Sequence, residues 1–332
     1  MANLSITTLC NKTCPYCFAE DSRQPYSKKG AFMSEAVFDA ALEYLARSGI
    51  DQVRLLGGEP TLHPQFNRMV DKALERGFQL MIFSNGLMPP KVQERLRRID
   101  PGEVVILLNT IHPLEADPRR MRRQQQTMEI LGPRVMPGVN IYSRQQELDY
   151  LLPYVEQYQL IREIRLGIAH PVLSESNVFL HPKFYKEIGL KILDLLHKAR
   201  ALDIELGFDC GFVPCMFPEA AAEELGELLQ RTGSRCHPIL DLLPDGNFIS
   251  CYPLNNLLKL PLQADTHAQQ LMETFEEKLA PYRRFGIYDH CAGCPLLQQS
   301  YCNGGCTAFK MNRLRHRSFA VPIDGMAPLL VE

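Results

Sequence analysis

The sequence lacks the features that mark membrane-spanning, secreted and nucleic-acid-binding proteins. None of its apolar runs approaches 18 residues, so no segment is long enough to cross a bilayer. Residues 1–10 lack the basic start and long apolar core of a signal peptide. The formal net charge is −2, which provides no bulk charge to steer the chain to nucleic acid or to a membrane. We therefore expect a cytoplasmic protein with no membrane partner and no nucleic-acid partner.

The chain also lacks internal repeats and low-complexity linkers, and its first two hundred residues alternate strand and helix patterns. Short apolar runs predict strands at 6–9, 53–56, 79–83, 104–108, 134–142 and 164–168. Amphipathic helices separate them; Ser34 is a predicted N-cap, and Gly49 is a predicted stop. Six such units favour an α/β fold, either an open doubly wound sheet or a partial barrel, with the site at the carboxyl ends of the strands.

After about residue 205 the composition changes, because cysteine, glycine and proline become dense and helical patterns become short. The clearest remaining helices are predicted at 219–230 and 268–279. We expect a core domain at 1–205, a second, loop-rich domain at 206–320 and a tail at 321–332.

Eleven cysteines are many for a chain expected in a reducing compartment, where metal ligation is favoured over disulfides. Cys10, Cys14 and Cys17 form a C-x3-C-x2-C motif directly after the first predicted strand. Three thiolates on a four-iron cluster leave one iron open, which is what catalysis needs. A zinc knuckle or buried free thiols are the alternatives.

The segment Cys10-Asn-Lys-Thr-Cys14-Pro-Tyr16-Cys17 resembles the signature of the radical S-adenosylmethionine (SAM) superfamily, with Tyr16 as the aromatic residue before the third cysteine. The resemblance implies a partial (β/α)6 TIM-like barrel that binds a [4Fe–4S] cluster. It also implies that the amino and carboxylate groups of SAM chelate the open iron. One-electron cleavage of SAM would then yield the 5′-deoxyadenosyl radical.

Gly57-Gly58-Glu59-Pro60 follows the second predicted strand, about 40 residues after the cysteine motif. Two glycines let the backbone approach a ligand closely, and free carbonyls accept hydrogen bonds from an ammonium group. The segment is similar to the GGEP motif of the superfamily, which implies that its backbone holds the amino group of SAM. An ordinary strand-to-helix turn is the alternative.

Polar side chains lie at or near the ends of the later predicted strands. Ser84 and Asn85 close the third strand and are candidates for bonds to the ribose, although Asn-Gly is also a common turn. Asn109, Asn140 and Arg165 are candidates for contact with the nucleoside or the carboxylate of SAM, with structural roles as the alternative.

Three His-Pro pairs also follow strands, and rigid loop entry is favoured over substrate contact for His63, His112 and His170. The candidates for general acid or base are Tyr252, Asp209 and Asp245.

Eight further cysteines follow in the second predicted domain, the ligand count of two fully coordinated four-iron clusters. They are Cys210, Cys215, Cys236, Cys251, Cys291, Cys294, Cys302 and Cys306. The pattern resembles the SPASM domain, an auxiliary-cluster domain of peptide- and protein-modifying radical SAM enzymes. Two departures are a seven-residue third gap, where five is usual, and the absence of a cysteine after Cys306.

The resemblance implies that Cys236, Cys251, Cys306 and one upstream cysteine share one cluster. Cys291, Cys294 and Cys302 would hold the other. Two alternatives stay open: one auxiliary cluster with some free thiols, or a structural zinc site at Cys291–Cys306.

The resemblance leaves the substrate open. Hydrogen abstraction from a peptide or protein side chain is the first hypothesis, and a small metabolite in natural-product or cofactor biosynthesis is the second. A non-catalytic electron-transfer or scaffold protein is the third, and the GGEP and Ser84-Asn85 motifs argue against it. Tyr252 stands where sulfatase-maturing enzymes carry an acid, which argues against that activity.

The implied partners follow from the same resemblance. We expect a reductant such as flavodoxin or ferredoxin. Because Cys10 stands so near the first residue, leader-peptide binding would need a separate protein.

Overall fold

Seven consecutive parallel strands form the centre of the fold. The computed structural model describes residues 1–19, 31–115, 117–174, 177–221, 225–226, 228–229 and 236–315. Each strand pairs with the next in chain order. The strands are β1 (Ala2–Thr7), β2 (Gln52–Gly57), β3 (Gln79–Ser84), β4 (Val104–Asn109), β5 (Val135–Ile141), β6 (Glu163–Ile168) and β7 (Glu205–Phe208).

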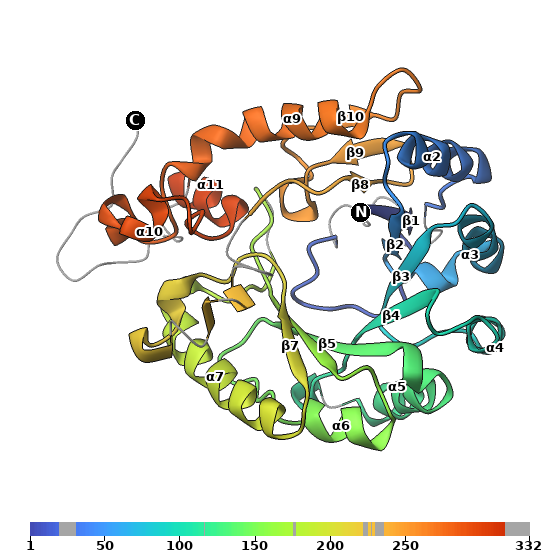
Figure 1. Cartoon of the computed structure of the whole chain (residues 1–332), viewed down its shortest axis with the longest axis horizontal. Helices are drawn as coiled ribbons and strands as arrows, with labels where there is room; N and C mark the ends of the chain where they lie inside the picture. The colour runs from blue at the N-terminus through green and yellow to red at the C-terminus, as the bar shows by residue number, and fades with distance from the viewer. Residues whose placement is uncertain are drawn as a thin grey trace.

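Helices cover the outer side of this curved sheet, as Figure 1 shows. Ser34 caps the first of them as predicted, because its side chain accepts a hydrogen bond from the amide of Val37. The helices are α2 (Glu35–Arg47), α3 (Phe66–Glu75), α4 (Pro90–Arg97), α5 (Pro118–Leu131), α6 (Leu151–Gln157) and α7 (Tyr185–Ala201). The predicted α/β partial barrel is confirmed, with seven parallel strands where the sequence predicted six.

Strand β1 shows how the sequence gives the sheet a polar inner side. Ala2, Leu4 and Ile6 are fully buried in the apolar core between the sheet and the helices. The alternate residues point to the opposite face, where Asn3 and Ser5 line cavities. The predicted strand at 6–9 was too late in the sequence, because a strand with one polar face does not read as the continuous apolar run typical of parallel sheets.

The C-terminal third extends the same sheet. The sheet continues from the free edge of β1 with β8 (Asp241–Leu242), β9 (Asn247–Ile249) and β10 (Leu260–Pro261). Strand β8 is parallel to β1, β9 is antiparallel to β8, and β10 is antiparallel to β9. Helix α9 (Ala268–Leu279), found where predicted, lies across them (Figure 1). The short helices α10 (Pro295–Gln298) and α11 (Thr307–Arg315) follow.

The division into a core domain, a second domain and a tail stays a prediction, and its boundary at residue 205 falls on the first residue of β7. Of the predicted helix at 219–230, residues 219–221 form a 3-10 turn and most of the rest lies outside the described residues. Within the described residues, no helix has the length and apolar content that a membrane span requires.

Candidate functional site

A cavity of about 270 Å³ opens at the carboxyl ends of the parallel strands, where the sequence predicted the site. Nearly all of the predicted core-site residues line it. They are Cys10, Cys14, Tyr16, Cys17, Gly57, Gly58, Ser84, Asn85, Asn109, Asn140 and Arg165. Residues predicted from motifs more than 150 positions apart therefore border one space. The assignment of individual roles to them stays a prediction.

The three cysteines of the first motif all border this cavity from one loop. The amide of Cys17 donates to the carbonyl of Cys14 at 3.0 Å, which folds the loop into a turn. Tyr16 stacks on Tyr142 with ring centres 4.7 Å apart, so its ring is held in place from β5. Burial raises the pKa of Cys14 to about 11, and Lys12 acts in the opposite direction. Three thiols on one cavity wall suit a cluster with one open iron.

Gly57 and Gly58 allow the cysteine loop to approach the end of β2. A Cβ atom on Gly57 would lie 2.2 Å from the carbonyl oxygen of Thr7, and one on Gly58 would lie 2.3 Å from that of Leu9. The amides of Gly58 and Glu59 donate to those same carbonyls at 2.8 and 2.7 Å. The glycines thus fix the start of the cysteine loop as well as bordering the cavity.

Glu59 points into the protein and does not line the cavity. Its carboxylate is fully buried and accepts hydrogen bonds from the hydroxyl of Thr61 at 2.6 Å and of Ser84 at 2.9 Å. It also accepts from the amides of Thr61 and Asn85. Burial raises the pKa of Glu59, while these donors lower it. Glu59 therefore ties the turn after β2 to the end of β3, and the neighbouring Pro60 is likewise buried.

The side chain of Asn85 is already engaged by the cysteine loop. It donates to the side-chain oxygen of Asn11 at 2.9 Å and approaches the sulfur of Cys10 at 3.7 Å. Its own oxygen accepts from the amide of Leu87. This geometry favours a role in positioning the cluster loop over the predicted bond to ribose.

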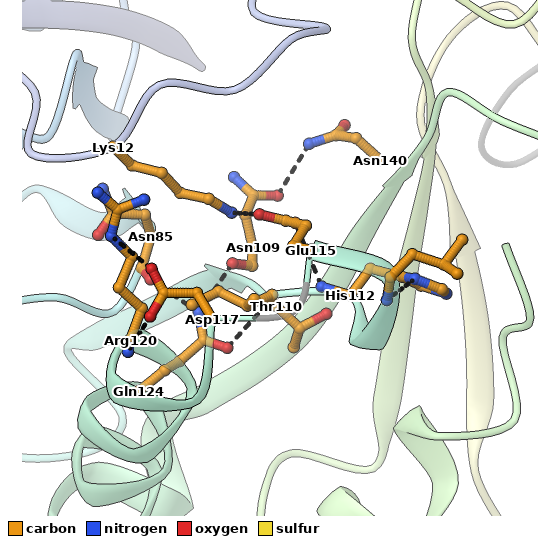
Figure 2. A network of polar contacts seen from close by, with 12 residues as sticks. Lys12, Asn85, Asn109, Thr110, His112, Glu115, Asp117, Arg120, Gln124 and Asn140 are labelled. Atoms are coloured by element: carbon orange, nitrogen blue, oxygen red, sulfur yellow. Dashed lines mark hydrogen bonds and ion pairs between the residues drawn. The ribbon is translucent and has the colours of Figure 1, made fainter.

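Two polar features beside this loop were not predicted, and Figure 2 shows both. Lys12 lies within the first cysteine motif, is almost fully buried and pairs with Glu115 at 2.7 Å. Gln124 of α5 donates to the backbone carbonyls of Asn85 and Asn109, so one side chain holds the ends of β3 and β4. The side chain of Asn140 donates to that of Asn109 at 3.3 Å.

Charged residues line the deeper part of the cavity. The guanidinium groups of Arg54 and Arg165 lie over the ring of Phe83, at 5.7 and 4.9 Å from its centre. Arg165 forms an ion pair with Asp209, whereas Arg54 has no hydrogen bond or ion pair within the described part of the chain. Burial raises the pKa of Asp241, which faces the same space, to about 7. A single arginine inside the apolar run of β2 was the sequence signal for this feature.

Two of the three candidates for general acid or base border the cavity, and the third does not. Tyr252 and Asp209 line the cavity, and Tyr252 packs on the ring of Phe18. Asp245 lies outside this cavity and accepts from the amide of Asn247 in a turn.

The histidines of the three His-Pro pairs bond to backbone carbonyls, which agrees with the preferred structural role. Their ring nitrogens lie within 3.2 Å of the carbonyl oxygens of Met33, Glu147 and Cys210, for His63, His112 and His170 respectively.

The eight C-terminal cysteines fall into two groups of four. One group consists of Cys210, Cys236, Cys251 and Cys306. After the larger effect of burial, Cys236 and Cys306 raise the pKa of both Cys210 and Cys251. The other group lines a separate small cavity and consists of Cys215, Cys291, Cys294 and Cys302. Within the described residues, no three His, Cys, Asp or Glu side chains converge closely enough to hold a single metal ion. A four-iron cluster requires a wider arrangement, because each of its thiolates binds a different iron.

Comparison with known sequences identifies the core. Residues 4–132 match the family model described as the Radical SAM superfamily. An S-adenosylmethionine-dependent nucleotide dehydratase of Selenomonas ruminantium is 36% identical over 98 residues, which are 27% of this chain and 34% of that protein. A GTP 3′,8-cyclase of Streptomyces coelicolor is 26% identical over 179 residues, covering 47% of this chain and 52% of that protein. The chain thus spans between a third and about half of the length of these relatives.

Comparison with solved structures covers nearly the whole chain. Streptococcus suis SuiB bound to S-adenosylmethionine matches 96% of this chain and 74% of its own, with a TM-score of 0.64 and 14% identity. The anSMEcpe protein with bound AdoMet matches 92% of this chain and 89% of its own, with a TM-score of 0.67 and 15% identity. These matches confirm the fold. The family match to residues 4–132 agrees with the predicted radical SAM core and with its predicted cofactors, a [4Fe–4S] cluster and S-adenosylmethionine.

Proposed function

We propose that this chain is a radical SAM enzyme that cleaves S-adenosylmethionine reductively and abstracts a hydrogen atom from a peptide or protein side chain. The observation that carries the proposal is the single cavity that the first cysteine motif shares with Gly57-Gly58 and the strand-end asparagines. When bound, the cluster supplies the electron that breaks a sulfur–carbon bond of S-adenosylmethionine.

Within this proposal the protein's own residues position the reactants and exclude water. Cys10, Cys14 and Cys17 would hold the cluster. The backbone at Gly57-Gly58 would hold the amino group of S-adenosylmethionine. Glu59 and the Lys12–Glu115 pair would act as positioning residues, because both fix the loops without facing the cavity with a free polar group.

The peptide class is supported by the extent of the fold similarity. SuiB has also been solved with the precursor peptide SuiA, and anSMEcpe with the Kp18Cys peptide. These two matches cover 96% and 92% of this chain and so extend into the cysteine-rich C-terminal third, whereas the nucleotide dehydratase of Selenomonas ruminantium matches 27% of it. A reductant of the flavodoxin or ferredoxin type and a separate leader-binding protein belong to the same proposal.

One observation favours a second candidate, a small anionic metabolite. Arg54 and Arg165 bring two positive charges to the cavity. Arg165 pairs with Asp209, whereas Arg54 forms no ion pair among the described residues and interacts only at longer range with Asp241. Guanidinium groups bind phosphate and carboxylate in a bidentate manner. The relatives named as a nucleotide dehydratase and a GTP 3′,8-cyclase match 27% and 47% of this chain.

Two measurements test the proposal. The first is the formation of 5′-deoxyadenosine by the anaerobically reconstituted chain with S-adenosylmethionine and dithionite. A Cys10/Cys14/Cys17 triple-alanine variant is the control, and equal product from both proteins would refute the assignment. The second uses deuterated peptides and deuterated nucleotides as separate substrate pools. Deuterium in 5′-deoxyadenosine from the peptide pool supports the first candidate, and deuterium from the nucleotide pool replaces it with the second.

A further inference from the structure

A small cavity in the C-terminal third brings together four sulfurs from three separate segments. Its volume is about 50 Å³, and Cys215, Cys291, Cys294 and Cys302 line it. The remaining walls are mainly apolar and include Val213, Pro214, Ile287, Leu296 and Leu297. A site of four soft sulfur donors within apolar walls suits an iron–sulfur cluster.

We propose that Cys215 is the fourth ligand of an auxiliary [4Fe–4S] cluster held by Cys291, Cys294 and Cys302. The sequence pattern that this chain resembles takes a ligand from beyond Cys306, but no cysteine follows that position here. The cavity instead brings in Cys215, from the segment that follows β7, beside the other three sulfurs. This assignment does not depend on which substrate the core takes.

Local structure fixes Cys215 in this place. It is the middle residue of a 3-10 turn, Pro214–Met216, in which the amide of Phe217 donates to the carbonyl of Pro214 at 3.1 Å. The turn packs against α7 at Gly189, where a Cβ atom would lie 2.0 Å from the carbonyl oxygen of Met216. The thiol of Cys215 then borders the same cavity as those of Cys291, Cys294 and Cys302.

A buried lysine lies near sulfurs of both groups. Lys310 is fully buried, donates to the carbonyl of Asn303 at 2.7 Å and has no carboxylate partner within the described residues. The charged groups that interact most with it are Cys236, Cys306 and Cys302, one or two from each group of four. An isolated buried cation is costly unless negative charge lies close by. Metal-bound thiolates provide that charge, and neutral thiols do not.

The assignment has a functional consequence. With Cys215 in place, both groups have four thiolates, so neither auxiliary cluster has an iron open to substrate. Their role is then electron transfer rather than substrate ligation.

The test removes the core cluster first, so that it does not depend on S-adenosylmethionine cleavage. In a Cys10/Cys14/Cys17 triple-alanine background, anaerobic reconstitution is expected to give about eight irons per chain. Adding Cys215→Ala is expected to lower this to about four, with the same loss from Cys291→Ala. Cys215→Ser keeps an oxygen ligand, and its cluster is expected to remain with an altered electron paramagnetic resonance spectrum.

Val213→Ala is the matched control, because it removes side-chain volume from the same cavity wall without removing a sulfur. It is expected to keep about eight irons. The proposal is overturned if Cys215→Ala keeps full iron and an unchanged spectrum. It is also overturned if Val213→Ala loses as much iron as Cys215→Ala, since the loss would then report packing alone. Zinc in place of iron in the background protein would equally overturn it.

Discussion

The buried ion pair between Lys12 and Glu115 makes a quantitative prediction about the first cysteine loop. Lys12 is between Cys10 and Cys14 in sequence, and its side chain is 4% exposed. Glu115, in the turn after β4, is 17% exposed and also accepts from the amide of His112 (Figure 2). Removing either partner leaves the other charge buried without its counterion.

The magnitude follows from that burial. Breaking a buried ion pair by removing one partner costs about 3–5 kcal/mol. Because Glu115 retains some exposure, we take the lower end, so Lys12→Met and Glu115→Gln should each lower the free energy of unfolding by about 3 kcal/mol. The double variant buries no unpaired charge. It should therefore be about 3 kcal/mol more stable than the sum of the two single effects predicts.

The assay is urea-induced unfolding of the apo protein, read by circular dichroism for the wild type, both single variants and the double variant. Iron content after reconstitution is measured in parallel, because a displaced loop should also bind less iron. Additive effects of the two single changes would refute the reasoning, since they would mean that Lys12 and Glu115 are each solvated independently.

Three further predictions concern single residues around the cavity. Burial raises the pKa of Asp241 to about 7, so the folded chain holds a proton that the unfolded chain releases. Stability should then fall as the pH rises from about 4 to 7, by up to about 4 kcal/mol, and Asp241→Asn should flatten this urea-unfolding profile. Gly58→Ala should abolish S-adenosylmethionine binding in equilibrium dialysis, because its Cβ would lie 2.3 Å from the carbonyl of Leu9. Gly77→Ala meets no atom within 4 Å, but its φ of 80° is in the left-handed region, so it should cost about 1–2 kcal/mol of stability and leave binding intact. Asn85→Ala should lower the iron content by a larger factor than it raises the KM for S-adenosylmethionine. The opposite result would support the predicted bond between Asn85 and the ribose.

How much of the fold could be predicted depended on strand length. Strands of six or seven residues, such as Val104–Asn109, carry enough apolar residues to be recognised. Strand β7 has four residues and contains Gly207, where a Cβ atom would lie 2.6 Å from the carboxylate of Glu163. Its sequence therefore gives no strand signal. Strands β8 to β10 have two or three residues each and depend on pairing that starts at the free edge of β1, which no local pattern reveals.

Some residues of the site could likewise be predicted from the sequence, and others could not. Gly57-Gly58 and the cysteines could be predicted because ligand chemistry limits which residues can occupy those positions. The partners that hold them could not, because Lys12 and Glu115 are distant in sequence and meet only when β1 and β4 enter one barrel. The role of Glu59 was also missed, since a motif shows that a carboxylate is present and does not show which way it points.

The two C-terminal cysteine groups are held close together by a short connector. Cys302 and Cys306 belong to different groups, and four residue steps span at most about 14 Å. The connector is shorter still, because Gly304 and Gly305 have φ angles of 72° and 83° that fold it back. A Cβ atom on Gly304 would lie 2.6 Å from the Cα of Gly286. The group containing Cys251 borders the main cavity, whereas the group containing Cys215 does not. If both groups hold clusters as proposed, an electron that leaves the substrate would reach the Cys251 group first, and the tight glycine turn would set the distance to the second.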